Sequence, residues 1–577
     1  MAAASPYEER VRRLALENAV THGGVARPGP ILSRLLATDP SARAVRAELG
    51  LLVERLAQEI SSLSASVQAA ELERLGGSEP ARAPTVHRAE GELPALPGAV
   101  DGAVVLRLAP FPSGRLHVGN ARMLFVNDYY RRLHHGKLLL VFDDTVGSEE
   151  KRIDPDMFDG IREDLAIAGV AVDSVYYKSD RLPIFYEWAR RVIDKGAAYV
   201  CRCPAELLRS NRALGAGCPE RSQTPEETRD LFEKMLSGAF AEGEAVLRLK
   251  TDLKDPDPAF RDRVLFRLSD VDHPRVGRRY RVWPLLEFSW AVDDVSLGVT
   301  HVLRGKDLVI EDRMESFLWN ILGEKGPTFV HWGLLRLRDV KLSKSKGYQE
   351  VHSGRYDGWA DPRLWSIASL DRRGISAEAL RRFTLSFGVS LADIEVPSET
   401  LYAENRKIID ATSLRRAFVF DPVRLDVERY PDGLGTVTLP NHPEHAELGE
   451  RAVAAGPSFW LARADLGPRA GAEVRLKDLV NVTLPLEIPA TGSPSLRADF
   501  TSRENRRLPR LQWVGLEGAV RVDVLDVEGQ HRTGLAESAL ASASPGEVLQ
   551  FERVGFVRVE RDWVPGTEPV RVVYGHP

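Results

Sequence analysis

Apolar side chains recur every three or four positions through the first 75 residues, which is the period of an amphipathic helix. The stretches "YEERVRRLALENAV" (7–20) and "VRAELGLLVERLAQEISSL" (45–63) show this period, and "HGGVARPGP" (22–30) separates them with Gly and Pro. The pattern predicts an N-terminal helical domain over 1–75. A stretch rich in Pro, Gly and Ala follows, and it predicts a linker over 76–98.

The pattern then changes to strand, helix and strand. "GAVVLRLAP" (102–110) and "KLLLVFDD" (137–144) are near-continuous apolar runs on either side of the helical stretch "ARMLFVNDYYRRL" (121–133). Two such strands joined by a helix indicate a parallel sheet that is covered on both faces. A second block of this kind begins with "RVWPLLEFSWAVDD" (281–294), which we expect to be helical.

The region between these two blocks starts with helical patterns and then changes character, which indicates a large insertion into one nucleotide-binding fold. Helical patterns return after the second block, and short alternating segments separated by Gly and Pro turns follow them. Such segments are typical of β-barrels or sandwiches. The predicted fold class is therefore multidomain, α/β plus all-β. Its expected parts are a catalytic first half (99–195), an inserted domain (196–280), a catalytic second half (281–350), a helical region (351–417) and β-barrels (418–577).

Composition narrows the class of protein. The chain has 577 residues, 43% of them hydrophobic and 28% charged, which is typical of a soluble multidomain protein. It contains no apolar run long enough to predict a membrane span. A net charge of -5 excludes a uniformly basic coat but leaves room for a local basic face. Only three cysteines occur, which favours a reducing cytoplasm over a disulfide framework.

The stretch "LAPFPSGRLHVGNARM" (108–123) places Gly114, His117 and Gly119 between a predicted strand and a predicted helix. Backbone N–H groups at a helix N-terminus bind anions, and glycines let a ligand approach the backbone closely. The stretch matches neither of the two common Gly-rich nucleotide motifs. The alternative is a helix cap at Ser113 with a buried structural histidine.

A second polar stretch, "DVKLSKSKG" (339–347), places Lys341, Lys344 and Lys346 in a loop that contains Ser and Gly. Lysines of this kind act as mobile point charges on polyphosphate. Taken alone, the stretch is equally typical of a solvated surface loop. The two stretches together are much more specific than either one.

Together, "HVGN" (117–120) and "KLSKS" (341–345) resemble the two signature motifs of class I aminoacyl-tRNA synthetases. The whole chain resembles the archaeal-type glutamyl-tRNA synthetases of the glutamyl/glutaminyl subfamily, because "LVFDDT", "GVTHVLRGKD" and "FERVGFVRV" also follow in that family's order. The resemblance implies a Rossmann catalytic domain with an inserted domain for the tRNA acceptor end. It also implies a helical stem-contact region and C-terminal β-barrels that read the anticodon.

The activity implied by the resemblance is ATP-dependent activation of glutamate and its transfer to the 3' end of tRNA(Glu). ATP is a substrate, and Mg²⁺ is expected to accompany it. The implied partners are tRNA and glutamate in the cytoplasm, with no membrane and no DNA. Whether tRNA(Gln) is also charged stays open.

The resemblance assigns catalytic roles to His117 and Asn120, which would meet the phosphates of ATP, and to Lys341 and Lys344, which would stabilise the leaving pyrophosphate. The residues that it implies for ATP binding are Ser113, Gly114, His117, Gly119, Asn120, Lys341, Ser343 and Lys344.

The resemblance also implies an amino-acid pocket. Arg107 and Arg304 would face the substrate carboxylates, and Asp143 would hold its amino group, while Ala109, Leu286 and Trp290 complete the wall. Two arginines that face one crevice would repel each other, so an anionic ligand would relieve that cost. The alternative for Arg107 is a structural ion pair. Asp293 and Asp294 are assigned no chemistry.

Some positions depart from the family pattern. Phe111, Leu286 and Trp290 make the pocket wall more apolar or bulkier than is usual. Two alternatives therefore stand beside the glutamate enzyme. One is a glutaminyl-tRNA synthetase, and the other is a repurposed paralogue that binds tRNA or a nucleotide without charging glutamate.

The three cysteines, Cys201, Cys203 and Cys218, are spaced like part of a zinc knuckle. A closed zinc site needs four ligands, and no further His or Cys lies nearby in the sequence. The interpretation from the sequence is three reduced thiols and no metal site.

Overall fold

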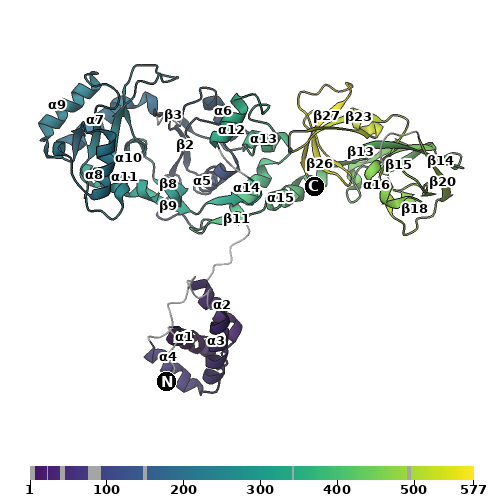
Figure 1. Ribbon diagram of the computed structural model, residues 1–577, viewed down its shortest axis with the longest axis horizontal. Helices are drawn as coiled ribbons and strands as arrows, with labels where there is room; N and C mark the ends of the chain where they lie inside the picture. The colour runs from purple at the N-terminus through teal and green to yellow at the C-terminus, as the bar shows by residue number, and fades with distance from the viewer. Residues whose placement is uncertain are drawn as a thin grey trace. The chain divides into compact units, whose positions relative to one another are not determined.

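The computed structural model describes residues 7–21, 24–38, 46–75, 92–146, 152–340, 344–489 and 495–577. The chain forms two compact units, residues 1–89 and 90–577. The first unit consists of helices, as the sequence predicts, and Val11, Leu35 and Leu56 lie in its apolar core (Figure 1). Its described helices are α1 (Glu8–Thr21), α2 (Pro28–Thr38), α3 (Arg46–Ser61) and α4 (Ala65–Arg74).

Residues 92–98 belong to the second unit and not to a linker. Leu93 and Leu96 are buried in its core, and Tyr130 donates a hydrogen bond to the Pro94 carbonyl at 2.8 Å. The expectation of a linker over 76–98 is therefore wrong at its C-terminal end, because two leucines among the prolines find an apolar surface. Residues 76–91 lie outside the described residues.

A parallel sheet forms the centre of the second unit (Figure 1). The Thr300 backbone N–H donates to the Val105 carbonyl at 2.9 Å, which places the second pair of strands beside the first three. The resulting order is β3-β2-β1-β8-β9, and the predicted parallel strands are confirmed. These strands are β1 (Val105–Leu108), β2 (Lys137–Phe142), β3 (Ser174–Tyr177), β8 (His301–Gly305) and β9 (Thr328–Trp332).

Two helices of the first half pack on this sheet. Leu106 and Leu140 of the strands share one apolar core with Phe125 and Ile161, so these two helices cover one face. The helices that matter for the site are α5 (Ala121–Leu133), α6 (Met157–Ile167), α10 (Leu286–Ser296) and α11 (Val309–Leu322).

The inserted region carries its own antiparallel sheet of β4 (Ala198–Cys201), β5 (Val246–Leu249), β6 (Val264–Leu268) and β7 (Val282–Pro284). Three helices accompany it: α7 (Leu182–Asp194), α8 (Ala205–Leu214) and α9 (Pro225–Leu236). The expectation of one helix over 281–294 is wrong for its first part. Val282–Pro284 pair with β6, where Trp283 is buried in the inserted core, so the helix starts only at Leu286.

After the sheet, the chain forms α12 (Lys344–His352), α13 (Ile367–Arg372), α14 (Ala377–Ser386) and α15 (Glu399–Ile409). A parallel pair of short strands, β10 (Leu335–Leu337) and β11 (Ile394–Val396), ties this region to the catalytic part. The helical expectation up to residue 417 is wrong at its end, because β12 (Leu414–Arg416) already pairs with a strand near the C-terminus.

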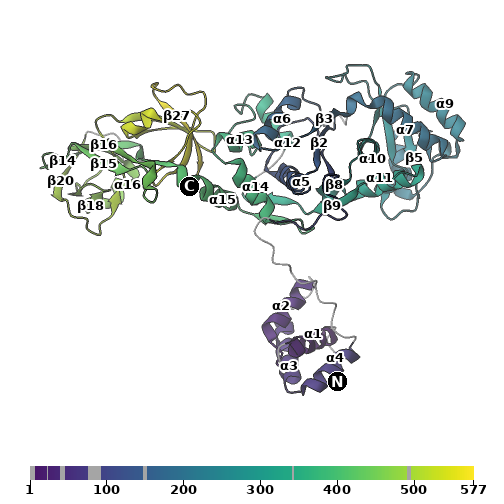
Figure 2. The ribbon, with the colours of Figure 1, turned by 180° about the vertical axis from the view of Figure 1, so that it is seen from behind.

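Two seven-stranded sheets make up most of the remaining chain, as the alternating pattern predicts (Figure 2). Their orders are β12-β25-β26-β27-β23-β24-β13 and β21-β18-β19-β20-β14-β17-β22, and β15 and β16 form a separate hairpin. The strands are β13 (Phe418–Phe420), β14 (Pro422–Glu428), β15 (Thr436–Pro440), β16 (Glu450–Ala454), β17 (Ser458–Ala462), β18 (Glu473–Leu476), β19 (Asn481–Thr483), β20 (Leu496–Ser502), β21 (Arg510–Leu511), β22 (Trp513–Gly515), β23 (Val520–Leu525), β24 (His531–Ala536), β25 (Val548–Phe551), β26 (Gly555–Val559) and β27 (Val570–His576).

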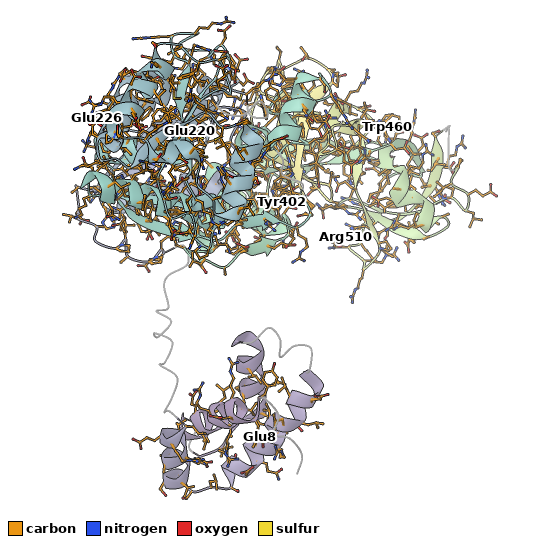
Figure 3. The ribbon with its side chains drawn as sticks, turned by 60° about the vertical axis from the view of Figure 1, so that its left-hand side comes forward. Glu8, Glu220, Glu226, Tyr402, Trp460 and Arg510 are labelled. Atoms are coloured by element: carbon orange, nitrogen blue, oxygen red, sulfur yellow. The ribbon has the colours of Figure 1, made fainter. Side chains whose placement is uncertain are left out.

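The helical region is bonded to the first of these sheets. Arg373 donates to the Gly575 carbonyl at 2.7 Å, and Arg372 forms an ion pair with Glu560 at 2.6 Å. Tyr402, labelled in Figure 3, stacks on His576 with ring centroids 5.0 Å apart. No helix in the described ranges is long and apolar enough to cross a membrane.

Candidate active site

β1 belongs to the first half of the catalytic part and β8 to the second half. The two strands are neighbours in the centre of the parallel sheet. The chain leaves β1 toward β2 on one side, whereas β8 continues to β9 on the other side. Ligands of such sheets bind outside the carboxyl ends of the strands where the strand order reverses. Arg107 and Arg304 lie near the carboxyl ends of these two strands, and both are buried.

Arg107 forms a two-bond ion pair with Asp294 of α10. Its Nη2 donates to Asp294 Oδ2 at 2.9 Å, and its Nε donates to Oδ1 of the same carboxylate. Burial lowers the pKa of Arg107, but the charge and hydrogen bond of Asp294, together with the charges of Glu315 and Asp293, raise the pKa overall. Arg107 therefore remains charged and has a partner within the protein.

Arg304 is paired as well. Its Nε donates to Asp312 Oδ1 at 2.8 Å and its Nη2 donates to Glu315 Oε1 at 2.8 Å, both on α11. Burial raises the pKa of Glu315 to about 8, although the Arg304 charge lowers it in part. The expectation of two unneutralised, repelling arginines is wrong, because α10 and α11 return to these strands and supply carboxylates.

Trp290 of α10 fills the space between the two arginines. Its ring lies 4.9 Å from Arg107 Cζ and 4.8 Å from Arg304 Cζ. Cations over an indole face are attracted to its quadrupole, and the attraction grows when water is excluded. The buried indole Nε1 and Arg304 Nη1 have no hydrogen-bond partner among the described residues. Both polar atoms are thus available to a bound molecule.

Asp143 follows β2 and is paired with Lys178, a residue that the sequence analysis missed. Lys178 Nζ lies 2.9 Å from Asp143 Oδ1 and donates to Ser289 Oγ at 2.7 Å. The Lys178 side chain is 0% exposed, and its ammonium lies 5.2 Å from the Trp290 ring centroid. The signal in the sequence was a lysine directly after an apolar strand, in "VYYKSD".

The structure therefore brings together four of the predicted pocket residues. Arg107 and Arg304 face the ring of Trp290, and Asp143 pairs with Lys178, whose ammonium faces the same ring. The other two predicted wall residues, Ala109 and Leu286, are half-buried; Ala109 directly follows β1 and Leu286 begins α10.

The loop "PSGRLHVGN" ends in a reciprocal cap in front of α5. His117 Nδ1 accepts from the Gly119 N–H at 3.0 Å, and Asn120 Oδ1 accepts from the His117 N–H at 3.2 Å. The capping residue is therefore His117, not Ser113. Gly119 is exposed, so its backbone can be approached by a ligand.

Gly114 has a different role from the one expected. A Cβ on Gly114 would lie 2.8 Å from the ring of Trp359. The missing side chain therefore makes room for an indole and not for a ligand, which corrects the reading of Gly114 as a place of close ligand approach. The loop is held further by the Val118 N–H, which donates to the Trp365 carbonyl at 3.0 Å.

Lys341 and Ser343 of the second motif lie outside the described residues. Lys344 begins α12, but its side chain is not among those described. The predicted roles of these residues stay predictions.

A separate group of donors lies in the inserted region. The sulfurs of Cys201, Cys203 and Cys218 and a carboxylate oxygen of Glu220 all lie within 4.8 Å of one another (Glu220 is labelled in Figure 3). Arg248 Nη1 lies 3.1 Å from Cys218 Sγ. Burial raises the pKa of Cys218, but hydrogen bonds and the Arg248 charge lower it overall. No further His or Cys completes the group, as the sequence predicts, but Glu220 supplies a carboxylate oxygen, and a carboxylate can also bind zinc.

Similarity to known proteins covers the parallel sheet and its insertion. The family described as "tRNA synthetases class I (E and Q), catalytic domain" matches residues 103–411, which include every pocket residue above. The chain belongs to this family. Two further matches, over 413–492 and 511–560, carry the description "anti-codon binding domain" of the same synthetases.

Curated relatives resemble this class I synthetase over nearly its full length. A glutamate–tRNA ligase of Methanopyrus kandleri is 39% identical over 98% of each chain. Enzymes with the same name from Pyrococcus abyssi and Thermococcus kodakarensis are 38% and 39% identical, over 98% of this chain in each case.

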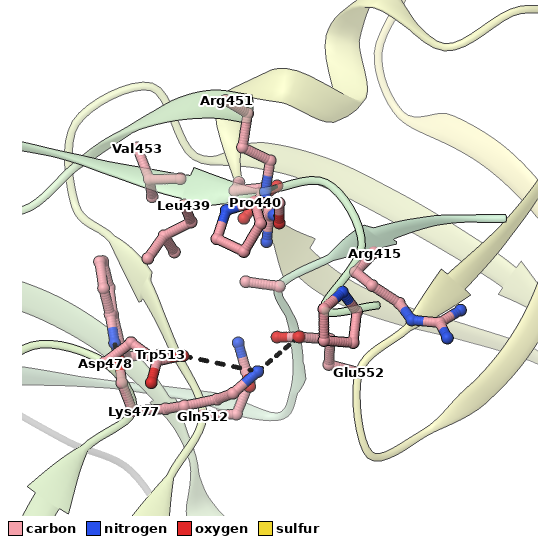
Figure 4. Close-up of a pocket in the computed structure, with 13 residues that line it drawn as sticks. Arg415, Leu439, Pro440, Arg451, Val453, Lys477, Asp478, Gln512, Trp513 and Glu552 are labelled. Carbon is pink, nitrogen blue, oxygen red and sulfur yellow. Dashed lines mark hydrogen bonds and ion pairs between the residues drawn. The ribbon is translucent and has the colours of Figure 1, made fainter. Parts of the chain in front are cut away.

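The anticodon-binding part of the synthetase holds a cavity of about 160 Å³ between the two seven-stranded sheets (Figure 4). Arg415 of β12, Glu552 after β25, Lys477 after β18 and Gln512 between β21 and β22 line it, and the β15–β16 hairpin contributes Leu439, Pro440, Arg451 and Val453. Lys477 and Glu552 form an ion pair across it at 2.5 Å. The Gln512 Oε1 is buried and has no hydrogen-bond partner among the described residues, so it can accept a bond from a ligand.

Proposed function

We propose that the chain is a glutamate–tRNA ligase that activates glutamate with ATP and transfers it to the 3' end of tRNA(Glu). The observation that carries the proposal is the convergence of Arg107, Arg304 and, through Lys178, Asp143 on the Trp290 ring, in a chain that resembles such ligases over nearly its full length. Class I synthetases use ATP as a substrate, and AMP and pyrophosphate leave.

The loop before α5 supports the first step. His117 and the backbone N–H groups at the N-terminus of α5 are proposed to meet the phosphates of ATP. Lys341 and Lys344 stabilise the charge that develops on the leaving pyrophosphate. We expect Mg²⁺ to accompany ATP, and we assign no protein ligand to it.

In the amino-acid pocket, Arg107 and Arg304 hold the carboxylates of glutamate while Asp143 holds its amino group. Ala109, Leu286 and Trp290 form the wall. Charge-assisted bonds to arginine are strong in a water-free site, and the unpaired Arg304 Nη1 offers one without breaking an existing pair. The substrate would thus enter an electrostatic network that is already balanced.

The tRNA is proposed to lie along the inserted region with its acceptor end and along the C-terminal sheets with its anticodon. The cavity that holds Gln512 would take one anticodon base. Whether tRNA(Gln) is charged in addition to tRNA(Glu) stays open, and no role for DNA is proposed. The three cysteines form no disulfide bond with one another, which supports a cytoplasmic location.

A repurposed paralogue is the second candidate, because the two arginines already have carboxylate partners and Asp143 already has an ammonium partner. ATP–pyrophosphate exchange with each amino acid, with and without tRNA, separates the two. We expect exchange with glutamate and with no other amino acid. Absence of exchange with every amino acid, in a folded protein that binds ATP, would favour the paralogue.

A further inference from the structure

Three cations face the Trp290 ring, and one of them is a lysine at the proposed position of the substrate amino group. Lys178 follows the carboxyl end of β3, which is separated from β8 by β2 and β1, and its ammonium reaches Asp143 at 2.9 Å. The ammonium also donates to Ser289 Oγ and faces the indole of Trp290. Two oxygen acceptors and an aromatic face form a complete site for a primary ammonium group.

This arrangement matches what a substrate amino group would need. An amino acid carries a primary ammonium, and Asp143 is the carboxylate that the proposed function assigns to it. Asp143 Oδ1 is already bonded to the Lys178 ammonium and accepts from the Thr145 hydroxyl at 3.3 Å, so a substrate ammonium at the same oxygen would meet a like charge in a site without water. Asp143 itself is only 5% exposed, so water does not compensate for either partner.

We infer that Lys178 is a specificity-determining residue that occupies the amino-group site of the empty pocket, so that an amino acid binds only by displacing the Lys178 ammonium from Asp143. The inference rests on the proposed function for the identity of the substrate. It does not rest on it for the presence of an internal ammonium in a cation site.

Without a bound ligand, the charged groups of the pocket are already paired with one another. Breaking a buried ion pair costs free energy, and this cost is subtracted from the affinity for every ligand that needs Asp143. The four-carbon stem of lysine has several rotatable bonds, so the ammonium can withdraw to other acceptors when a ligand amine arrives. Ligands without an amino group would leave the Lys178–Asp143 pair in place.

The first test is Lys178→Gln, whose amide can still donate to Asp143 but carries no charge. We expect the KM for glutamate in tRNA-dependent pyrophosphate exchange to fall by about tenfold, with kcat changed much less, because the competing ammonium is gone. Arg181→Gln is the matched control, since Arg181 pairs with Asp293 of α10 and not with Asp143. This control should keep the wild-type KM. A raised or unchanged KM in folded Lys178→Gln would overturn the inference.

The second test does not depend on activity. Lys178→Ala leaves a space beside the Asp143 carboxylate, and we expect n-butylammonium chloride to raise its Tm more than sodium chloride of the same ionic strength. Wild type should show no such difference, and the double variant Lys178→Ala/Asp143→Asn should lose it. If no form of the protein activates glutamate, the proposed function fails, and the amine titration alone decides the inference. No amine-specific shift in Lys178→Ala overturns it.

Discussion

Glu315 accepts a hydrogen bond from Arg304 Nη2 at 2.8 Å in a place where the Glu315 side chain has no exposed surface. The second oxygen, Oε2, has no hydrogen-bond partner among the described residues. Burial raises the pKa of this carboxyl to about 8, although the Arg304 charge lowers it in part. The charge balance of the pocket therefore depends on the protonation of Glu315.

The pH dependence of stability follows from this protonation. A carboxyl whose pKa is higher in the folded state stabilises the fold fully below its ordinary pKa, and this stabilisation is lost as the pH rises through about 8. We expect the free energy of unfolding in urea to fall between pH 5 and pH 9 by a few kcal/mol more in wild type than in Glu315→Gln, which keeps the neutral form. Parallel pH profiles of the two proteins would contradict this assignment.

Trp290 supports the same pocket by packing. Trp290→Ala removes a ring that contacts two buried arginines and a buried lysine, so we expect a loss of about 3 kcal/mol or more in the free energy of unfolding. Trp290→Phe is the control, because it keeps an aromatic face and should lose clearly less. Urea unfolding followed by circular dichroism measures both. Equal losses for the two variants would show that the aromatic face does not matter.

The second motif is tested by Lys344→Ala. Loss of one cation that stabilises transition-state charge typically costs about 3 kcal/mol, or about a hundredfold in rate. We expect a loss of that size in pyrophosphate exchange. Lys346→Ala, two residues further on, is the matched control and should retain most of the activity. A folded Lys344→Ala protein with the wild-type exchange rate would remove this lysine from the mechanism.

The cluster of Cys201, Cys203, Cys218 and Glu220 predicts a zinc content. Three sulfurs and one carboxylate within 4.8 Å provide four ligands for a tetrahedral site. We expect elemental analysis to find about one zinc per chain, and Cys218→Ser to lower both this content and the Tm. A purified protein that holds no zinc, and whose Tm does not respond to added zinc or to a strong chelator, would show that the cysteines are simple thiols.

Gln512 tests the anticodon cavity. Gln512→Glu places a negative charge beside the proposed position of a base, where the phosphates of tRNA are also near. We expect the KM for tRNA in aminoacylation to rise by about tenfold, while ATP binding by the same protein serves as the check on folding. Charging of tRNA with wild-type kinetics would exclude this cavity from anticodon recognition.

Much of the fold could be predicted from the sequence because its signals are local. The apolar runs before and after 121–133 are long enough to identify buried parallel strands, and the alternating segments after 418 identify the β region. The strand Val282–Pro284 could not be identified in this way. Its three residues continue an apolar helical pattern, and only the edge of β6 makes them a strand.

The candidate site was predictable only in part. Arg107, Asp143 and Arg304 could be placed from the resemblance, but their partners Asp294, Asp312, Glu315 and Lys178 come from other elements. The distance along the chain between Arg107 and Asp294 carries no information about a bond between them. Glu220 could not be identified for another reason. Zinc-binding sequence patterns are recognised by their His and Cys residues, whereas a carboxylate ligand has no such signature.

The short segment Trp365–Arg373 is bonded at both ends. The Trp365 carbonyl accepts from the Val118 N–H in the loop before α5, and Arg373 donates to the Gly575 carbonyl in the C-terminal sheet. Such a shared segment leaves no boundary at which the helices could open without breaking bonds on both sides. The catalytic part and the first C-terminal sheet should therefore melt in one cooperative transition, and a chain cut after residue 418 would lose heat stability in its nucleotide-binding half as well.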